Sequence, residues 1–181
     1  IMFLLILGVF KKKSSKLIHN LSSIVLLITA VIVFNETLGI KQALLFNDSV
    51  IIDYLSSFMK IVTLLAAFLV LAISSNYLKI FKLSKIEYPI LILSSVLGMM
   101  VMISSNDLIV FYMGLELQSL ALYVLATFNR DQLKSSEAGL KYFVLSALSS
   151  GLLLYGCSLV YGFTGSTNFN LIADQLNADQ Y

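Results

Sequence analysis

The sequence predicts an all-α membrane protein, and three observations lead to that fold class. Hydrophobic residues make up 59% of the 181 residues and charged residues only 12%, against roughly 25% charged residues in soluble domains. The mean hydropathy is +0.92, and the apolar residues form runs of about 20, long enough to cross a bilayer as helices. These runs are apolar on every side, unlike the alternating strands of a membrane barrel. We therefore expect one helical domain, 1–181, with about six transmembrane helices.

The apolar runs give the order of the expected helices. The first run, residues 1–10, covers only about half of a bilayer, so this helix is expected to be short or truncated. An initial Ile is consistent with a missing segment or with a non-standard start codon, and both readings stay open. Further spans are expected at about 17–34, 54–74 and 89–104, then from the Asn106–Asp107 turn, which can cap the helix, to Phe128, and from Glu137 to Gly165. Residues 166–181 are expected to be a polar connection or tail.

The positive charges support this order of helices. Nine basic residues fall in the first, third and fifth loops, and only Lys41 falls in a connection on the opposite side. The positive-inside rule therefore places the loops 11–16, 79–87 and 129–135 on the matrix or cytoplasmic side. Of the basic residues, only Lys60 and Lys141 lie within expected spans. Lys60 is near the beginning of its helix and is expected to extend its amine to the interface.

Glu116 and Lys141 are the candidate functional residues, because an ionisable group inside a membrane costs about 3 kcal/mol or more. Their helices are joined by a short loop and should be antiparallel neighbours. Glu116 lies about 18 Å and Lys141 about 8 Å from that loop at helical rise, a gap that long side chains or one water could close. Two readings stay open: a static ion pair that locks two helices, or a lysine whose proton affinity depends on a movable acid.

Small residues and hydroxyl groups in the spans predict helix packing and water binding, less specifically than Glu116 and Lys141 predict a functional site. The last span carries a stripe of small residues that favours close helix contact: Ala147, Gly151, Ser158 and Gly162. Hydroxyl and amide groups in or near the last three spans could bond across helices or hold water for a proton wire: Ser104, Ser105, Gln118, Ser119, Ser146, Ser149 and Ser150. His19 is interpreted as an interfacial structural residue and Cys157 as a packing residue. Metal-spaced Cys/His sets, nucleophile constellations and basic nucleic-acid surfaces are absent from the sequence.

Two segments carry a resemblance to a known family. YMGLELQSLALYVLA, followed by SSEAGLKYFVLSALSSGLLLYGCSLVYGFTGST, resembles the antiporter-like chain 2, or chain N in bacteria, of proton-translocating NADH:quinone oxidoreductase, respiratory complex I. The resemblance is strongest over 106–165 and implies leading helices in 1–75 and the opening part of an antiporter-like inverted repeat in 88–165. It also implies that Glu116 modulates the neighbouring lysine and that Lys141 belongs to an intramembrane chain of charges.

The resemblance further implies a function. The chain would be a subunit of an H⁺-translocating NADH:ubiquinone reductase, with no cofactor of its own and with FMN, iron–sulfur clusters and ubiquinone in other subunits. Family members usually have about 14 spans, so this chain is expected to be a fragment or a split-gene product that a separate chain completes. The alternatives are a non-pumping scaffold of the membrane arm, or a subunit of a related cation/proton antiporter or membrane hydrogenase.

The expected surroundings follow from the same resemblance. The partners would be other membrane-arm subunits, including neighbouring antiporter-like chains, together with membrane lipids, and no nucleic acid. The expected location is the mitochondrial inner membrane, with the bacterial inner membrane as the alternative. In the mitochondrial case, the three basic loops would face the matrix.

Overall fold

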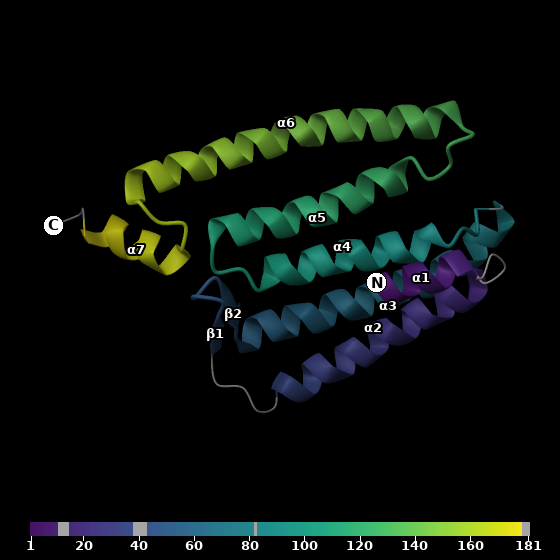
Figure 1. Ribbon diagram of the computed structural model, residues 1–181, viewed down its shortest axis with the longest axis horizontal. Coiled ribbons are helices and arrows are strands. Elements are labelled where there is room, and N and C mark those ends of the chain that lie inside the picture. Colours follow the sequence, from purple (N-terminus) through teal and green to yellow (C-terminus); the bar gives the residue numbers. More distant parts are fainter. Residues whose placement is uncertain (11–14, 38–42, 82, 179–181) are drawn as a thin grey trace.

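A row of antiparallel helices forms the structure, a computed structural model that describes residues 1–10, 15–37, 43–81 and 83–178. The helices are α1 (Met2–Phe10), α2 (Ser15–Thr37), α3 (Tyr54–Ile80), α4 (Glu87–Ile103), α5 (Leu108–Ala126), α6 (Leu133–Thr164) and α7 (Phe169–Ala178). A hairpin of strands β1 (Ala43–Leu45) and β2 (Val50–Ile52) precedes α3. Figure 1 shows α2 to α5 side by side, with α6 at the edge of the row.

The predicted all-α membrane fold is confirmed. Four helices, α2, α3, α5 and α6, are long and apolar enough to cross a membrane, and α4 is a shorter apolar helix. With α1 only 9 residues long, the count of about six spans stays a prediction. Two elements were not foreseen in the connections, namely the β-hairpin and α7, which forms where a polar connection or tail was expected.

The helix ends follow from short polar motifs. Asp53 and Ser56 form a reciprocal cap at the start of α3, with the Ser56 N–H 2.7 Å from Asp53 Oδ1 and the Asp53 N–H 3.0 Å from Ser56 Oγ. Asp107 caps α5, as predicted, because its Oδ1 accepts from the Ile109 N–H at 2.8 Å. Asn106, expected to share that role, donates instead from its side-chain amide to the Asp48 carbonyl at 2.9 Å.

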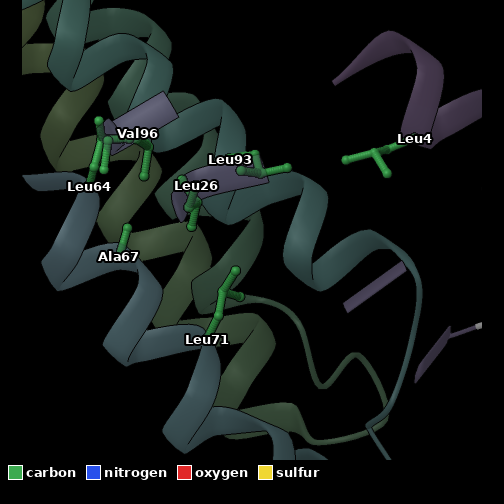
Figure 2. Packing of buried hydrophobic residues seen from close by; sticks show 8 residues of the cluster. Leu4, Leu26, Leu64, Ala67, Leu71, Leu93 and Val96 are labelled. Carbon is green, nitrogen blue, oxygen red and sulfur yellow. The ribbon is translucent and has the colours of Figure 1, made fainter. Parts of the chain in front are cut away.

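The apolar core lies between α2, α3 and α4. Buried residues recur every seven positions on α3, at Leu64, Leu71 and Leu78, which keeps one face of that helix toward its neighbours. Figure 2 shows the labelled side chains of α2, α3 and α4 near one another, with Leu4 of α1 to one side. The buried cluster comprises Leu4, Leu26, Ala30, Leu64, Ala67, Leu71, Leu93 and Val96.

The backbones of α4 and α5 come into contact where Gly98 and Gly114 face each other. A Cβ atom added to Gly98 would lie 2.7 Å from the Gly114 carbonyl oxygen, and one added to Gly114 would lie 2.7 Å from the Met102 nitrogen. By contrast, nothing lies within 4 Å of a Cβ added to Gly151 or Gly162, in the small-residue stripe predicted on α6. The backbone contact of α4 with α5 is therefore made by two glycines outside the predicted stripe, while Gly139 of α6 approaches the Thr127 side chain at the end of α5.

Three connections are tied together at the end of the bundle where the hairpin lies (Figure 1). The Asp48 carbonyl accepts from the side-chain amides of Asn106, at 2.9 Å, and Asn168, at 3.0 Å. The Thr167 hydroxyl donates to Asp107 Oδ2 at 2.5 Å. These bonds join the hairpin turn, the α4–α5 turn and the segment before α7. They therefore hold the first residues of α5 close to the last residues of α6.

Candidate functional site in a polar cleft between α5 and α6

A polar cleft of about 250 Å³ separates the middle of α5 from the middle of α6. Three of its lining residues are spaced by four on α5, and four come from one face of α6: Leu115, Ser119, Tyr123, Ser146, Ser149, Ser150 and Leu153. Four of the seven are serines, so hydroxyl groups face the cleft from both helices. A polar cavity of this size has room for several waters held by such hydroxyls.

Glu116 lies beside this cleft, at the ninth of the 19 residues of α5. The Ser150 hydroxyl of α6 donates a hydrogen bond to Glu116 Oε1, and the Tyr112 hydroxyl oxygen lies 3.0 Å from Ser150 Oγ. Tyr112 and Glu116 are four positions apart, so they share one face of α5. The three half-buried side chains form a hydrogen-bonded chain that joins the two helices at mid-length.

The direction of this chain follows from donor counting. A serine hydroxyl has one proton to donate and two lone pairs that accept. Since the Ser150 proton is donated to the Glu116 carboxylate, the Tyr112 hydroxyl must be the donor to Ser150. A carboxylate in the middle of a membrane-spanning helix is thus stabilised by a neutral hydroxyl, with a second hydroxyl behind it.

Lys141 lies near the start of α6, away from the cleft. Its Nζ forms an ion pair of 2.6 Å with Glu137 Oε1, one turn earlier on the same helix. The side chains of Lys141 and Glu137 are 67% and 55% exposed, and the most apolar part of α6 has no buried residue in this chain. The pair therefore lies on a helix face that the described residues leave open.

The structure does not bring Glu116 and Lys141 together. Gly139 faces Thr127 across the helix pair and Ser150 faces Glu116, so Lys141 is level with Leu125, nine residues from Glu116. Nine residues correspond to about 14 Å along the helix axis. This offset is larger than the one predicted from the distances of the two residues from the loop, which a single water could have bridged. The register of two helices depends on their packed side chains, and it offsets the two residues further than their distances from the loop suggested.

Several residues of this site were missed or only partly predicted. Ser150 was one of several hydroxyl groups named from the sequence, while Tyr112 and Glu137 were not identified as site residues. The spacing of four between Tyr112 and Glu116, and between Glu137 and Lys141, was a signal that could have found them. The bond to Ser150 depends on the register between two helices, which no pattern in the chain displays.

His19 has the structural role that was expected. Its Nε2 lies 2.9 Å from the Leu71 carbonyl oxygen of α3, so the ring joins α2 to α3 near one end of the bundle. Cys157 is a free, half-buried cysteine on α6. Within 1–10, 15–37, 43–81 and 83–178, no three His, Cys, Asp or Glu residues are grouped as a metal site.

The fold and the site define a class of membrane protein: a helical protein with several spans, with an acid at the centre of one span and a lysine on the next. Residues 105–180 match the family described as NADH:quinone oxidoreductase/Mrp antiporter, TM. NADH-quinone oxidoreductase subunit N of Pelagibacter ubique is 71% identical over 181 residues, which are 100% of this chain and 38% of that protein. The subunit N of Maricaulis maris is 55% identical over 95% of this chain and 36% of its own length. The chain is similar to these subunit N proteins over nearly all of its length and spans little more than a third of theirs.

Solved structures give the same fold. A chain of respiratory complex I from Thermus thermophilus with bound aureothin superposes with a TM-score of 0.76 at 27% identity, over 92% of this chain and 36% of that one. A chain of an archaeal membrane-bound sulfane sulfur reductase superposes with a TM-score of 0.80 at 23% identity, over 95% of this chain and 37% of that one. The second likeness supports the fold alone.

Proposed function

We propose that this chain contributes to proton translocation in the membrane arm of an NADH-quinone oxidoreductase. The observation that carries the proposal is the chain Tyr112–Ser150–Glu116, which joins two spans at mid-length beside a polar cleft. The relatives named as subunit N support membership of that complex. The chain would carry no redox cofactor, while FMN, iron–sulfur clusters and the quinone would bind other subunits.

The hydrogen-bonded chain would respond to protonation of Glu116 by changing its direction. When Glu116 takes up a proton from water in the cleft, its carboxyl O–H becomes a donor to Ser150 Oγ. Ser150 then turns its own proton toward the Tyr112 oxygen, the Tyr112 hydroxyl turns its proton away from Ser150, and each bond of the chain is reversed. Loss of the proton from Glu116 restores the first arrangement, so protonation of one carboxylate reorients three side chains on two helices.

Lys141 would take part through a change of partner. Its ion pair with Glu137 holds a positive charge near the start of α6. About 14 Å separates the levels of Lys141 and Glu116, so their coupling would need a file of waters along the cleft or a shift of one helix. Movement of Lys141 toward Glu116 would replace its ion pair with Glu137 by an ion pair with Glu116.

The test is Glu116→Gln in the full-length chain within the intact complex, in closed membrane vesicles. We expect NADH-driven proton translocation to fall by about tenfold or more, because positioned proton-transfer groups commonly contribute at least that much. NADH oxidation by a soluble acceptor should stay unchanged. Glu87→Gln is the matched control, since Glu87 is an exposed glutamate in the first turn of α4, outside the cleft. An unchanged translocation rate together with an unchanged number of protons per electron pair would contradict the proposal.

A non-pumping scaffold is the second candidate, favoured by the open face of α6. No residue in the most apolar part of that helix is buried in the chain, and its Gly151 and Gly162 have free space beside them. Such a face suits cover by a further antiporter-like segment, another membrane-arm subunit or lipid. A scaffold would keep full translocation in Glu116→Gln. A related antiporter or hydrogenase would not copurify with NADH-oxidising peripheral subunits.

The proposed location is a bacterial inner membrane. The subunit N relatives come from the bacteria Pelagibacter ubique and Maricaulis maris, which favours this alternative over the mitochondrial inner membrane expected from the sequence. The three basic loops would then face the cytoplasm. Fractionation of the source cells, with the chain followed by an antibody, would separate the two locations.

A further inference from the structure

A second pocket lies at the opposite end of the bundle from the β-hairpin, where α2 begins and α3 ends (Figure 1). It has a volume of about 370 Å³ and is independent of the α5–α6 cleft. Its lining comes from α2, from α3 and from the segment before α4: Ser15, Lys16, His19, Asn20, Ser23, Ala72, Ser75, Leu78, Lys79, Ser84 and Lys85. The proposed proton-transfer chain uses none of these residues.

The pocket is positively charged. Lys16, Lys79 and Lys85 approach it from three different segments, and no acidic residue lines it. None of these three exposed lysines makes an ion pair with another described residue. The acid nearest in sequence, Glu87, lines a separate apolar groove between α1 and α4. The Lys85 Nζ also lies 5.7 Å from the centre of the Phe128 ring. A pocket lined by three lysines and by no carboxylate favours an anionic ligand.

Neutral side chains and a helix start complete the pocket wall. His19 is held by its Nε2 bond of 2.9 Å to the Leu71 carbonyl oxygen, so its ring has a fixed position in the pocket wall. Ser15, in the first turn of α2, places the start of a helix in the pocket wall, and the positive end of a helix dipole also favours anions. Ammonium groups beside a helix start match the negative oxygen atoms of a phosphate.

Exposed apolar side chains beside the pocket favour a lipid over a free anion as its ligand. Leu17 follows Lys16 on α2 and Ile80 follows Lys79 on α3, and their side chains are 55% and 76% exposed. Apolar side chains beside a basic pocket, at the end of three membrane helices, suit a molecule with a charged head and acyl chains. Basic pockets between membrane helices on the positive side commonly hold lipid head groups.

We propose that this pocket binds the phosphate head group of an anionic phospholipid from the leaflet on the positively charged side of the chain. The lysines would hold the phosphate, and the acyl chains would lie along the exposed apolar faces of α2 and α3. The lipid would join the ends of α2 and α3 to the segment that leads into α4.

The test uses the intact complex with its full-length chain, depleted of lipid and supplied with photoactivatable phosphatidylglycerol. Labelled residues are mapped by mass spectrometry. We expect labelling at the α2–α3 pocket, displaced by unlabelled phosphatidylglycerol and not by phosphatidylcholine or inorganic phosphate. The double variant Lys16→Gln/Lys79→Gln should lose about fivefold or more of the labelling, as expected for two lysines at a lipid surface.

The matched control is Arg130→Gln/Lys134→Gln, which removes two exposed charges at the same end of the bundle outside the pocket. It should keep full labelling, as should Lys16→Arg/Lys79→Arg, which retains the charge. Equal loss in both glutamine pairs would overturn the proposal, because it would indicate general surface attraction. Displacement by inorganic phosphate would indicate a free-anion site, and no labelling in the unmodified complex would indicate cover by another subunit. The competition experiments use unmodified protein, so they separate a lipid site from a free-anion site even if a variant does not assemble.

Discussion

The two neighbours of α5 contact it in opposite ways. Against α4, backbones meet at Gly98 and Gly114, where even a methyl group has no room. Against α6, polar side chains bridge the helices through Ser150 and Glu116, and a cleft of about 250 Å³ remains beside them. Backbone contact resists change because any displacement opens a void, whereas a hydrogen-bonded contact beside water can exchange partners. We infer that α4 and α5 form the fixed side of the site and α6 the side that can respond to protonation.

Gly114→Ala should have the largest effect, because it breaks the fixed contact. The added Cβ would lie 2.7 Å from the Met102 nitrogen, and backbone atoms cannot move aside as a side chain can. Overpacking of this kind costs about 1–3 kcal/mol, so less chain should be retained in the membrane and the thermal unfolding midpoint of the complex should fall. Gly151→Ala is the control, since its Cβ meets nothing within 4 Å. Equal stability of the two variants would show that the α4–α5 contact at Gly114 is no more sensitive to an added methyl group than the open face of α6.

Ser150→Ala should weaken the responsive contact without disturbing the fixed one. The proton translocation rate should fall severalfold, because Glu116 and Tyr112 lose the hydroxyl that joins them, while Ser150→Thr should restore most of it. Ser158→Ala is the control on the same helix, because its hydroxyl bonds only to the Tyr155 carbonyl, at 2.7 Å. Translocation rates in vesicles, divided by NADH oxidation rates, measure the effect. Equal rates in the two alanine variants would count against the hydrogen-bonded chain.

Asp107→Ala tests the helix that both contacts share. The side chain caps α5 and also accepts from the Thr167 hydroxyl at 2.5 Å. Loss of a helix cap costs about 1 kcal/mol, so the unfolding midpoint should fall by less than in Gly114→Ala. Asp107→Asn should keep most of the stability because an amide oxygen can still cap. If the alanine and asparagine variants are equally unstable, the charge of Asp107 matters more than the cap.

Glu137→Gln should have the smallest effect on stability. An exposed ion pair one helical turn apart is worth about 0.5 kcal/mol or less, so the unfolding midpoint should barely change. Translocation should nevertheless change measurably, because Lys141 loses its partner. A large loss of stability without a change in translocation would show that the pair is structural. Lys134→Gln, which removes an exposed charge one turn before Glu137, is the control for the loss of a charge on this helix.

Much of the fold could be predicted from the sequence because a membrane helix is specified by residues that are consecutive in the chain. The runs of apolar residues, the Asp107 cap and the spacing of lysines each depend on a few consecutive positions, and the expected spans agree with α2 to α6 to within a few residues at most ends. The hairpin was missed because its turn uses Phe46, Asn47 and Asp48 at positive φ, between 53° and 64°. Those residues carry no glycine signal, and bonds from Asn106 and Asn168, distant in sequence, hold the turn.

The sequence by itself determined a membrane protein with an acid and a lysine inside consecutive spans, since hydropathy and charge are properties of each residue. Only the tertiary structure decided which side chains bond to Glu116 and to Lys141. Helix register depends on all the packed side chains at once, and a shift of two residues moves a side chain by about 3 Å along the axis. That register pairs Glu116 with Ser150 and leaves Lys141 with Glu137 on the open face of α6.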